Sequence, residues 1–566
     1  MMIEGLLGFW QQHLPLFSVL LPALTAVLLI LMGDSKSSHP AVAQASIRRQ
    51  RWVSFGSALL GLGMAVVLLV HAQQGAIVSY ALGEWQAPFG INLVLDRLSA
   101  LMLLLTYMVA VPALAYACCG WDGRGRYFHA MFQFQLMGLS GAFLTGDLFN
   151  LFVFFEILLL ASYVLLVHGQ GAKRFRMGVH YVVLNLVASA LFLLGLALVY
   201  ASTGTLNMTD VALKVATLTG DEAVLARTAA FVLLVVFGLK AALVPLYFWL
   251  PNTYAAASAP VAALFAIMTK VGVYSIIRVH ALIFGVDAGE SALAVAAWLL
   301  PLALLTSVLG VLGALAAHTL KRLVAYLTVS SVGTILVAIS LFNPSSLAAA
   351  LYYMMHSTLV IAGLFLFVEL ISSQRGKIKD VLQPASRVQE PVLLGLLLLL
   401  GAASVAGLPP LPGFLGKLMI LESSAGLASH AIVWTVVLLV GLLGIIGLAR
   451  AGVILFWHVH VDEKSDQNIP PANRVLLSMT MLLLSVGFFM AAFAAPMKRY
   501  MDATALQLYD RPAYAQAVLG LQGDLDQNIT TRPYQGEPPS TIPKKYQQPT
   551  DQQSVNPQPT EVQALP

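Results

Sequence analysis

The sequence predicts an all-α polytopic membrane protein with about 14 transmembrane helices. Hydrophobic residues make up 59% of the 566 residues and charged residues only 10%, whereas soluble domains average about 45–50% apolar and about 25% charged residues. The apolar residues also gather in stretches of about 20, the length that a helix needs to cross a hydrocarbon layer of about 30 Å. A soluble domain organisation is therefore excluded.

These stretches give the predicted helices in chain order. We expect the first stretch to be retained as a span, because the opening MMIEG lacks the positively charged region of a signal peptide. The spans are predicted near 13–32, 53–71, 92–118, 126–145, 147–168, 177–201, 228–250, 257–283, 292–316, 323–342, 346–371, 391–422, 430–457 and 474–496.

Two of the predicted spans contain prolines that indicate broken helices. Pro245 follows Lys240 in KAALVPLYFWLP, and three prolines precede Lys417 in GLPPLPGFLGK. Proline removes a backbone donor and kinks a helix, and unwound backbone at membrane depth is tolerated only where protein or water covers it. Two broken spans, five spans apart and each beside a lysine, are typical of the internal repeats of ion-coupled transporters. Kinks that serve packing alone are the alternative.

The loop charges predict the orientation. Cytoplasmic loops carry an excess of Lys and Arg. The loops after spans 1, 3, 5, 9, 11 and 13 hold most of these residues, whereas the loops of opposite parity hold only Lys214 and Arg227. We therefore expect both termini to face the outside, although Lys498 and Arg499 after the last span argue weakly against this for the C-terminus.

The chain divides into four predicted regions. Residues 1–90 hold two helices and a loop, 91–460 hold the core from the third helix to the thirteenth, and 461–505 hold a loop and the last helix. Residues 506–566 are rich in Pro, Gln and other polar residues, a composition that cannot bury a core and predicts a disordered tail. A docking role for this tail is the less favoured alternative to an inert one.

Several kinds of chemistry are not expected. The two cysteines, Cys118 and Cys119, are adjacent, and no residues with metal-ligand spacing accompany them. The sequence holds no Gly-rich nucleotide motif in a strand-to-helix context and no iron–sulfur spacing. The net charge of +5 is modest, so no nucleic-acid partner is implied. We expect no cofactor and no metal.

Charged residues inside the predicted spans are the main functional signal. A charge at the centre of a membrane helix costs about 2.5–3.5 kcal/mol on insertion scales, so several together indicate an ion or proton path. The spans contain Glu156, Lys240, Lys270, Arg278, His356, Glu369 and Lys417, with Asp96 at the start of the third span. Arg278 and Glu369 lie toward helix ends and favour a structural role, and Asp96 fits either role.

Depth supports this interpretation for the central residues. Glu156 lies nine residues after Asp147, the predicted start of its span, which is about 13.5 Å along a helix axis and near the middle of the membrane. Lys240 and Lys270 lie at similar depth in their spans. A lysine near Glu156 would favour its charged form, so the two could exchange a proton. The phenylalanines around Glu156 would keep bulk water away.

Each of these residues also has a structural explanation. Glu156 could form a neutral hydrogen bond between helices, and Lys270 and Lys417 could extend toward the membrane surface. His356 could be a core histidine whose hydrogen bonds are satisfied.

Five stretches together resemble a known family. They are GDLFNLFVFFEILLLASYVLL (146–166), GLKAALVPLYFWLPNTYAAASAPVAALFAIMTKVGVYSIIR (238–278), LKRLVAYLTVSSVG (320–333), HSTLVIAGLFLF (356–367) and GLPPLPGFLGKLMI (407–420). They resemble the antiporter-like membrane subunits of respiratory NADH:quinone oxidoreductase, membrane-bound hydrogenases and the multisubunit Mrp/Mnh/Pha-type cation/proton antiporters. Within this superfamily, the first and last stretches are most similar to the D subunits of the Mrp/Pha-type antiporters. The resemblance covers about residues 90–460.

The resemblance implies 14 helices with two inverted five-helix repeats, at helices 4–8 and 9–13. It also implies proton-path roles for Glu156, Lys240, Lys270, His356 and Lys417. At two positions where many relatives carry a lysine and a His or Gln, this chain carries Ile361 and Ser331. We therefore expect water or serine hydroxyls to complete the polar axis between Lys270 and Lys417.

The sequence thus predicts a transporter subunit rather than an enzyme. It would translocate protons in a multisubunit complex of the bacterial inner membrane that exchanges Na⁺ or K⁺ for H⁺, with other subunits and the lipid bilayer as its partners. One alternative is a proton-pumping module of a redox complex, which neighbouring genes for flavin and iron–sulfur subunits would indicate. A scaffold without transport is the other, and it would tolerate neutral replacements of Glu156, Lys240 and Lys417 together.

Overall fold

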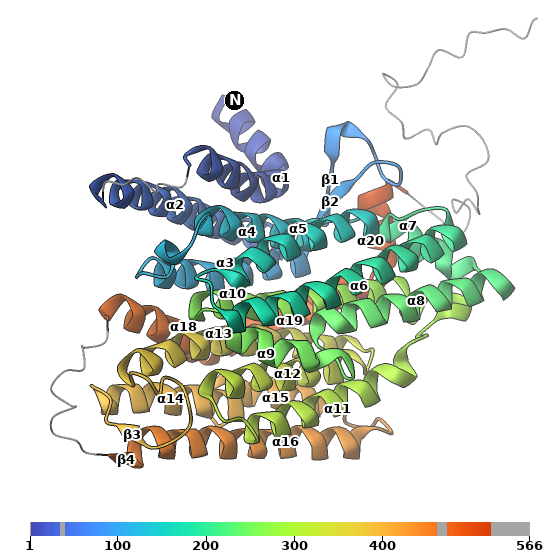
Figure 1. Cartoon of the computed structure of the whole chain (residues 1–566). Coiled ribbons are helices and arrows are strands. Elements are labelled where there is room, and N and C mark those ends of the chain that lie inside the picture. The colour runs from blue at the N-terminus through green and yellow to red at the C-terminus, as the bar shows by residue number, and fades with distance from the viewer. Residues whose placement is uncertain (1, 34–39, 461–472, 522–566) are drawn as a thin grey trace, which may run out of the picture.

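A computed structural model describes residues 2–33, 40–460 and 473–521, and helices dominate this part of the chain (Figure 1). Twelve of the described helices are long and apolar enough to cross a membrane. The predicted spans near 126–145 and 391–422 fall on shorter helices, of 17 residues in one case and of 16 and 12 residues in the other. A polytopic all-α fold is confirmed, and the count of 14 spans stays a prediction.

The α-helices are α1 (Met2–Leu31), α2 (Pro40–Gln73), α3 (Arg97–Ala117), α4 (Phe128–Leu144), α5 (Leu148–Val167), α6 (Ala172–Thr203), α7 (Met208–Thr217), α8 (Gly220–Ala241), α9 (Trp249–Ala256), α10 (Ala259–Ile277), α11 (Ala296–Leu315), α12 (Leu320–Ile339), α13 (Pro344–Gln374), α14 (Pro391–Ala406), α15 (Pro412–Ser423), α16 (His430–Gly452), α18 (Arg474–Ala492), α19 (Ala494–Tyr509) and α20 (Arg511–Leu519). Short 3₁₀ turns are η1 (Leu82–Glu84), η2 (Asp122–Arg124), η3 (Leu246–Phe248) and η5 (Gly289–Ser291), and η4 (Arg278–Ile283) and η6 (Val453–Trp457) are π-helical.

Two helices form the centre of the bundle. In Figure 1 the chain runs from α1–α5 at the top, through α6 and α8 in the middle, to α11, α12 and α16 at the bottom. In the most apolar stretch of each helix, the buried share is 100% for α10 and 94% for α13, against 39% for α6 and for α16. Side chains on α10 and α13 are therefore shielded by protein along nearly the whole helix, whereas α6 and α16 border the outer surface.

Four short strands were not anticipated from the sequence. The strands β1 (Val78–Ala81) and β2 (Asn92–Leu95) form an antiparallel hairpin with Val78 opposite Leu95. This hairpin lies at the same end of the bundle as α7 and α20 (Figure 1). The strands β3 (Ala385–Ser386) and β4 (Val459–His460) form a parallel pair. Stretches this short fall below what periodicity can indicate.

The predicted helix breaks are confirmed at both places. The helix α8 ends at Ala241, Ala242 takes a left-handed conformation with φ 65°, and the chain continues through η3 into α9. The helix α14 ends at Ala406, Gly407 has φ 81°, and α15 begins at Pro412. A left-handed residue after the last turn is a common way to end a helix. Both breaks therefore expose backbone carbonyls inside the bundle.

The C-terminal region differs from its prediction. The sequence predicts a polar tail over 506–566, yet α19 continues to Tyr509 and α20 occupies Arg511–Leu519. The reason is a set of anchors that composition does not show. The Arg511 guanidinium donates to the carbonyls of Leu282, Ile283 and Asp287 at distances of 3.0, 2.8 and 2.6 Å, which fixes α20 to the end of η4. Residues 522–566 lie outside the described part of the chain.

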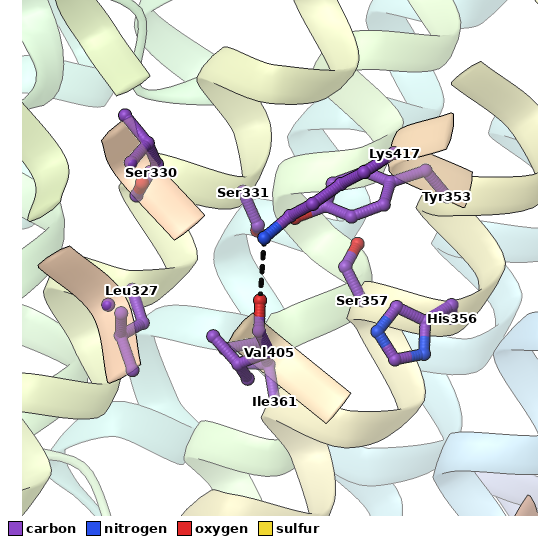
Figure 2. A pocket seen from close by; sticks show the side chains of 11 residues that line it. Leu327, Ser330, Ser331, Tyr353, His356, Ser357, Ile361, Val405 and Lys417 are labelled. Carbon is purple, nitrogen blue, oxygen red and sulfur yellow. Dashed lines mark hydrogen bonds between the residues drawn. The ribbon is translucent and has the colours of Figure 1, made fainter. Parts of the chain in front are cut away.

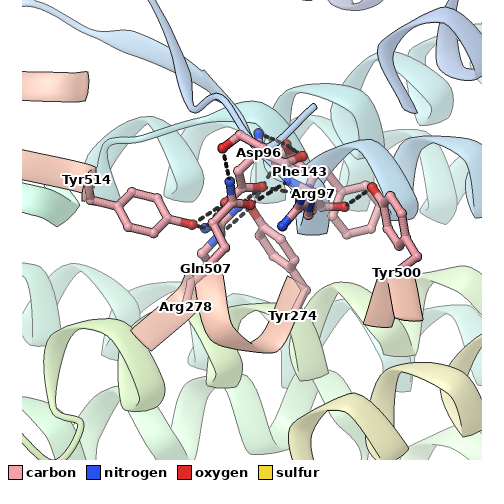
Figure 3. A network of polar contacts seen from close by, with 10 residues as sticks. Asp96, Arg97, Phe143, Tyr274, Arg278, Tyr500, Gln507 and Tyr514 are labelled. Carbon is pink, nitrogen blue, oxygen red and sulfur yellow. Dashed lines mark hydrogen bonds and ion pairs between the residues drawn. The ribbon is translucent and has the colours of Figure 1, made fainter. Parts of the chain in front are cut away.

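A tyrosine of α20 bonds to a buried ion pair in the core (Figure 3). Arg278 on η4 contacts both carboxylate oxygens of Asp96, at 2.5 and 2.7 Å, and donates to the hydroxyl of Tyr274 at 2.9 Å. Tyr514 on α20 donates to Asp96 and accepts from Arg278. Asp96 also caps α3 by accepting from the backbone N–H of Ser99. This network holds the ends of α3, α10 and α20 together and supports the predicted structural role of Arg278.

Gly272 sets the distance between α8 and α10. A Cβ atom built at Gly272 would lie 2.6 Å from the backbone nitrogen of Ala241 and 2.9 Å from the carbonyl oxygen of Phe237. Both atoms are backbone and cannot move away independently of the helix. Only glycine therefore allows α10 to approach α8 this closely, next to Lys240.

We predict that Gly272→Val separates the two helices and destabilises the protein. Overpacking of a tight core typically costs about 1–3 kcal/mol, so the detergent-solubilised variant should aggregate at a lower temperature, as measured by size-exclusion chromatography after heating. Gly63→Val on α2 is the matched control, because Gly63 is exposed and a Cβ there would meet nothing within 4 Å. Equal melting of the Gly272 variant and the control would contradict this role.

We also predict that Asp96→Asn destabilises the protein strongly. Asparagine preserves the helix cap but leaves the Arg278 charge buried without a counter-ion, a change that typically costs about 3–5 kcal/mol. The double variant Asp96→Asn with Arg278→Met should recover much of this loss in the same heating assay. A double variant that melts no higher than the single one would show that the network stabilises through shape alone.

Candidate functional site

The predicted site residues lie on a row of adjoining helices. Glu156 is on α5, Lys240 on α8, Lys270 on α10, His356 on α13 and Lys417 on α15. The helix α6 packs against both α5 and α8, α8 packs against α10, α10 against α13, and α13 against α15. The fold therefore arranges all five predicted residues along one path of contacting helices, with α6 as an additional member.

Glu156 contacts α6 rather than a lysine. Its carboxylate accepts a hydrogen bond from the hydroxyl of Ser189. Phe154 and Phe155 are buried, but Glu156 itself is only partly buried, and Leu160, one turn along α5, is 62% exposed. The phenylalanines cover the carboxylate on the inner side of α5, whereas its outer side faces away from the bundle, and the predicted exclusion of bulk water stays a prediction.

Lys240 also bonds to α6. Its Nζ donates to the Oδ1 of Asn185 at 2.9 Å and lies 5.8 Å from the centre of the Phe155 ring. The amide of Asn185 is oriented by a second hydrogen bond, from its Nδ2 to the carbonyl of Tyr181 at 2.8 Å. The carbonyl oxygen of the side chain thus faces the lysine, which suits a protonated Nζ.

The predicted charge pair between Glu156 and Lys240 is not a direct contact. In the part of the chain that the structure describes, no ion pair joins these two side chains, and each bonds to its own residue on α6. Asn185 and Ser189 are four residues apart and therefore lie on one face of α6. They form a neutral polar bridge between the two charges, and sequence reasoning missed it. Two polar residues at this spacing within an apolar span were the available signal.

Lys270 has no counter-ion within the described residues. The side chain is fully buried on α10, and its Nζ reaches only the hydroxyl of Thr269 at 3.4 Å, longer than an ordinary hydrogen bond. The alternative of a lysine extending to the membrane surface does not fit this burial. Lys270 is an ammonium group, or a neutral amine, enclosed at the core of the bundle.

Lys417 bonds to the broken end of α14. Its Nζ donates to the carbonyl of Val405 at 3.0 Å (Figure 2) and to that of Ala406 at 2.8 Å. The last carbonyls of a helix have no intrahelical partner and attract cations. Gly441 on α16 gives the amine room, because a Cβ there would lie 3.1 Å from Nζ. Lys417 is therefore held inside the bundle, not at its surface.

His356 and Lys417 share a small cavity. Nε2 of His356 lies 3.2 Å from the carbonyl of Ser404, while Nδ1 is buried without a partner among the described residues. The cavity measures about 20 Å³, and its lining includes the side chains of Ser331 and Ser357 (Figure 2). One water molecule requires about 10–15 Å³ by this kind of measure. The space therefore suits a single water between the histidine and the lysine.

The two positions at which this chain differs from many members of the similar family line this same cavity. Ser331 on α12 and Ile361 on α13 lie in its wall together with Lys417. The Ser331 hydroxyl donates to the carbonyl of Thr328 at 2.8 Å, which leaves its oxygen able to accept. This cavity is therefore the place where a water or a serine hydroxyl could complete the polar axis beside Lys417, with Ile361 as an apolar neighbour.

The remaining intramembrane charges pair with one another. Arg278 is bound to Asp96, as described above, and Glu369 lies 3.5 Å from the Nζ of Lys321. Both pairs lie at helix ends, which supports the structural roles predicted for Arg278 and Glu369. Asp96, for which the sequence left both roles open, takes part in the structural network.

The surroundings of Cys118 differ from the expectation. Potential metal-ligand atoms of Cys118, Asp122 and His129 lie within 4.8 Å of one another, so the expectation that no such residue accompanies the cysteine was wrong. Asp122, however, accepts hydrogen bonds from Arg51 at 2.6 and 2.8 Å. Burial opposes its charge, but the hydrogen bonds from His129 and Arg51 lower the pKa of Asp122 to about 2. Its charge is already neutralised by arginine, and this argues against a metal site.

Comparison with known proteins identifies the family of this chain. The model of the family described as NADH:quinone oxidoreductase/Mrp antiporter, TM matches residues 145–447. The chain is 40% identical to the D subunit of a probable K(+)/H(+) antiporter of Rhizobium meliloti, over 90% of this chain and 98% of that protein. It is 36% identical to the D subunit of a Na(+)/H(+) antiporter of Alkalihalophilus pseudofirmus, over 90% of this chain and 100% of that protein. A chain of the Mrp complex from Dietzia sp. superposes with a TM-score of 0.79 at 26% identity, over 90% of this chain and 99% of that one. The protein belongs to the NADH:quinone oxidoreductase/Mrp antiporter family and is similar within it to the antiporter D subunits.

Proposed function

We propose that this chain is the proton-translocating subunit of a multisubunit transporter that exchanges Na⁺ or K⁺ for H⁺ across the bacterial inner membrane. The observation that carries this proposal is the row of polar groups on α5, α6, α8, α10, α13 and α15, enclosed by apolar helices. Buried ionisable groups at membrane depth are costly and mark ion or proton paths. The names of the two relatives favour cation exchange over a redox-driven pump.

The first part of the path runs through the polar bridge on α6. Ser189 bonds to Glu156 and Asn185 bonds to Lys240, so the hydroxyl and the amide lie between the acid and the base. We infer that a proton passes from Glu156 toward Lys240 when a charge approaches Glu156. The bridge lets the two groups influence each other without the direct contact that would lock them as an ion pair.

The second part runs from Lys270 to Lys417. Lys270 lacks a carboxylate partner among the described residues, and Lys417 bonds only to carbonyls. Either amine can therefore lose its proton without leaving a bare carboxylate beside it. We infer that a water in the 20 Å³ cavity carries the proton between His356 and Lys417.

The outer side of Glu156 indicates where another subunit packs. A partly exposed carboxylate at mid-membrane depth would face lipid if the chain stood alone, which is unfavourable. The exposed Leu160 beside it adds apolar area. We propose that a partner subunit covers this face of α5 and supplies the charge that starts each cycle.

Cation-dependent dissipation of a proton gradient tests the proposal. Everted membrane vesicles that contain the complete complex should lose their proton gradient when Na⁺ or K⁺ is added, and vesicles with Glu156→Ala or Lys240→Ala should retain it while the complex still assembles. Normal exchange with Glu156→Ala would overturn the proposal. A response to NADH or hydrogen in place of cations would favour the redox-module alternative.

We predict that removing the α6 bridge slows exchange without loss of the complex. The double variant Asn185→Leu with Ser189→Ala removes both hydrogen bonds and should lower the exchange rate at least about tenfold. A tenfold lower rate corresponds to an activation barrier raised by about 1.4 kcal/mol, which is what the loss of one or two hydrogen bonds typically costs. Ser202→Ala is the control on the same helix, because Ser202 donates to a backbone carbonyl of α6. Exchange equal to that of the control would exclude a role for the bridge.

A second prediction concerns the cavity at Lys417. Ser331→Val adds two methyl groups in place of the hydroxyl and should fill the space that suits one water, so exchange should fall severalfold although Glu156 and Lys240 are intact. Ser331→Ala keeps the volume open and should retain most of the rate. Initial rates of gradient dissipation compare the two variants. Equal rates would show that this cavity does not carry protons.

A further inference from the structure

A basic pocket lies where the beginnings of α6 and α12 meet α9. It measures about 540 Å³, and α9 packs against both other helices (Figure 1). Among the described residues that line it, the charged ones are all cations. The lining residues are Ala172, Lys173, Arg176, Met177, Asn252, Ala255, Thr319 and Arg322.

The cations of this pocket have no partner among the described residues. Among the described residues, the exposed side chains of Lys173 and Arg176 have no hydrogen-bond or ion-pair partner, and Nε of Arg322 is buried without an acceptor. Four other cations on loops of the same parity have partners: Arg51 bonds to Asp122, Lys321 to Glu369, Arg174 to the carbonyl of Ala256, and Arg450 to that of Ala317. A buried guanidinium nitrogen without an acceptor indicates that the pocket's own acceptor is missing from this chain.

The start of α6 strengthens the attraction for an anion. The helix α6 begins at Ala172 without a side-chain cap, so its first backbone N–H groups are free to bind a ligand. Helix N-termini carry partial positive charge and bind phosphate groups readily. The first N–H groups of α12, in contrast, are already bonded to Thr319 and Asp380. Three side-chain cations and one free helix N-terminus thus converge on one space.

An apolar strip continues from the pocket along α6. Phe175 is 68% exposed, Val179 is 50% exposed and Val183 is 54% exposed. Val179 and Val183 follow Arg176 at three and seven residues, which places them on the same face of the helix. A ligand that fits both features has a phosphate group and long apolar chains.

We propose that this pocket binds the phosphate head group of an anionic phospholipid, whose acyl chains lie along Val179 and Val183 of α6. Basic pockets between transmembrane helices on the cytoplasmic side are suited to such head groups. The lipid would join α6, which carries the polar bridge, to α12, which carries Ser331, at the cytoplasmic end that the loop charges predict. Binding can be measured without transport, so the inference does not depend on the proposed function.

Native mass spectrometry of the full-length chain, purified and delipidated in a neutral detergent, tests the proposal. Phosphatidylglycerol should bind in preference to phosphatidylcholine. The triple variant Lys173→Gln, Arg176→Gln and Arg322→Gln should bind phosphatidylglycerol about 100-fold more weakly, since each of the three cations near a membrane surface contributes roughly fivefold. Arg176→Gln alone should weaken phosphatidylglycerol binding roughly fivefold. This single variant keeps the test decisive if the triple variant folds poorly.

The matched control removes the same charge elsewhere. Arg48→Gln, Arg49→Gln and Lys377→Gln replace three exposed cations of the same loop parity and should leave phosphatidylglycerol binding unchanged. An equal loss in this control would show that only overall charge matters and would overturn the proposal. Competition by millimolar inorganic phosphate would assign the pocket to a soluble anion. Unchanged lipid binding by the triple variant, with loss of other subunits on purification, would assign it to a protein contact.

Discussion

Backbone N–H and carbonyl groups within the hydrocarbon layer must find their partners inside the protein, and this requirement organises the structure. Water is not present to satisfy the carbonyls that a broken helix exposes. At the break after α14, Lys417 supplies the missing donors to Val405 and Ala406. At the break after α8, the ring nitrogen of Trp249 donates to Leu239 at 3.0 Å. At α14 a side chain beyond the break thus returns to carbonyls left open, whereas at α8 Trp249 adds a second bond to a carbonyl that already accepts from the Ala242 N–H.

Close helix packing then determines which groups share an environment. Gly272 brings the backbone of α10 against α8 beside Lys240, and Gly413 brings α15 against the end of α14, where a Cβ would overlap the carbonyl oxygen of Ser404 and lie 2.8 Å from the ring of His356. Without these two glycines the helices would stand further apart, and the polar side chains between them would lose their neighbours. The packing and the polar path are therefore one arrangement.

The sequence predicted the features that depend on composition and spacing along the chain. Apolar stretches located the helices, prolines located the two breaks, and the cost of buried charge selected Glu156, Lys240, Lys270, His356 and Lys417. It could not predict contacts that depend on how helices face one another. Asn185 and Ser189 are ordinary polar residues until α6 is placed between α5 and α8. The ordered α20 was hidden because Arg511 finds its carbonyls on η4, about 230 residues away.

Three cations outside the path differ in their partners from the lysines of the path. Buried Arg278 and partly buried Arg51 and Lys321 bond to carboxylates. Lys240 and Lys417 bond instead to an amide and to backbone carbonyls, and Lys270 has only a hydroxyl near its Nζ. A cation held by a carboxylate cannot release a proton without leaving an unpaired negative charge in a medium that solvates it poorly. A lysine held by neutral dipoles becomes a neutral amine among neutral groups. The choice of partner thus fits Arg278 to hold helices together and fits Lys240, Lys270 and Lys417 to change protonation state.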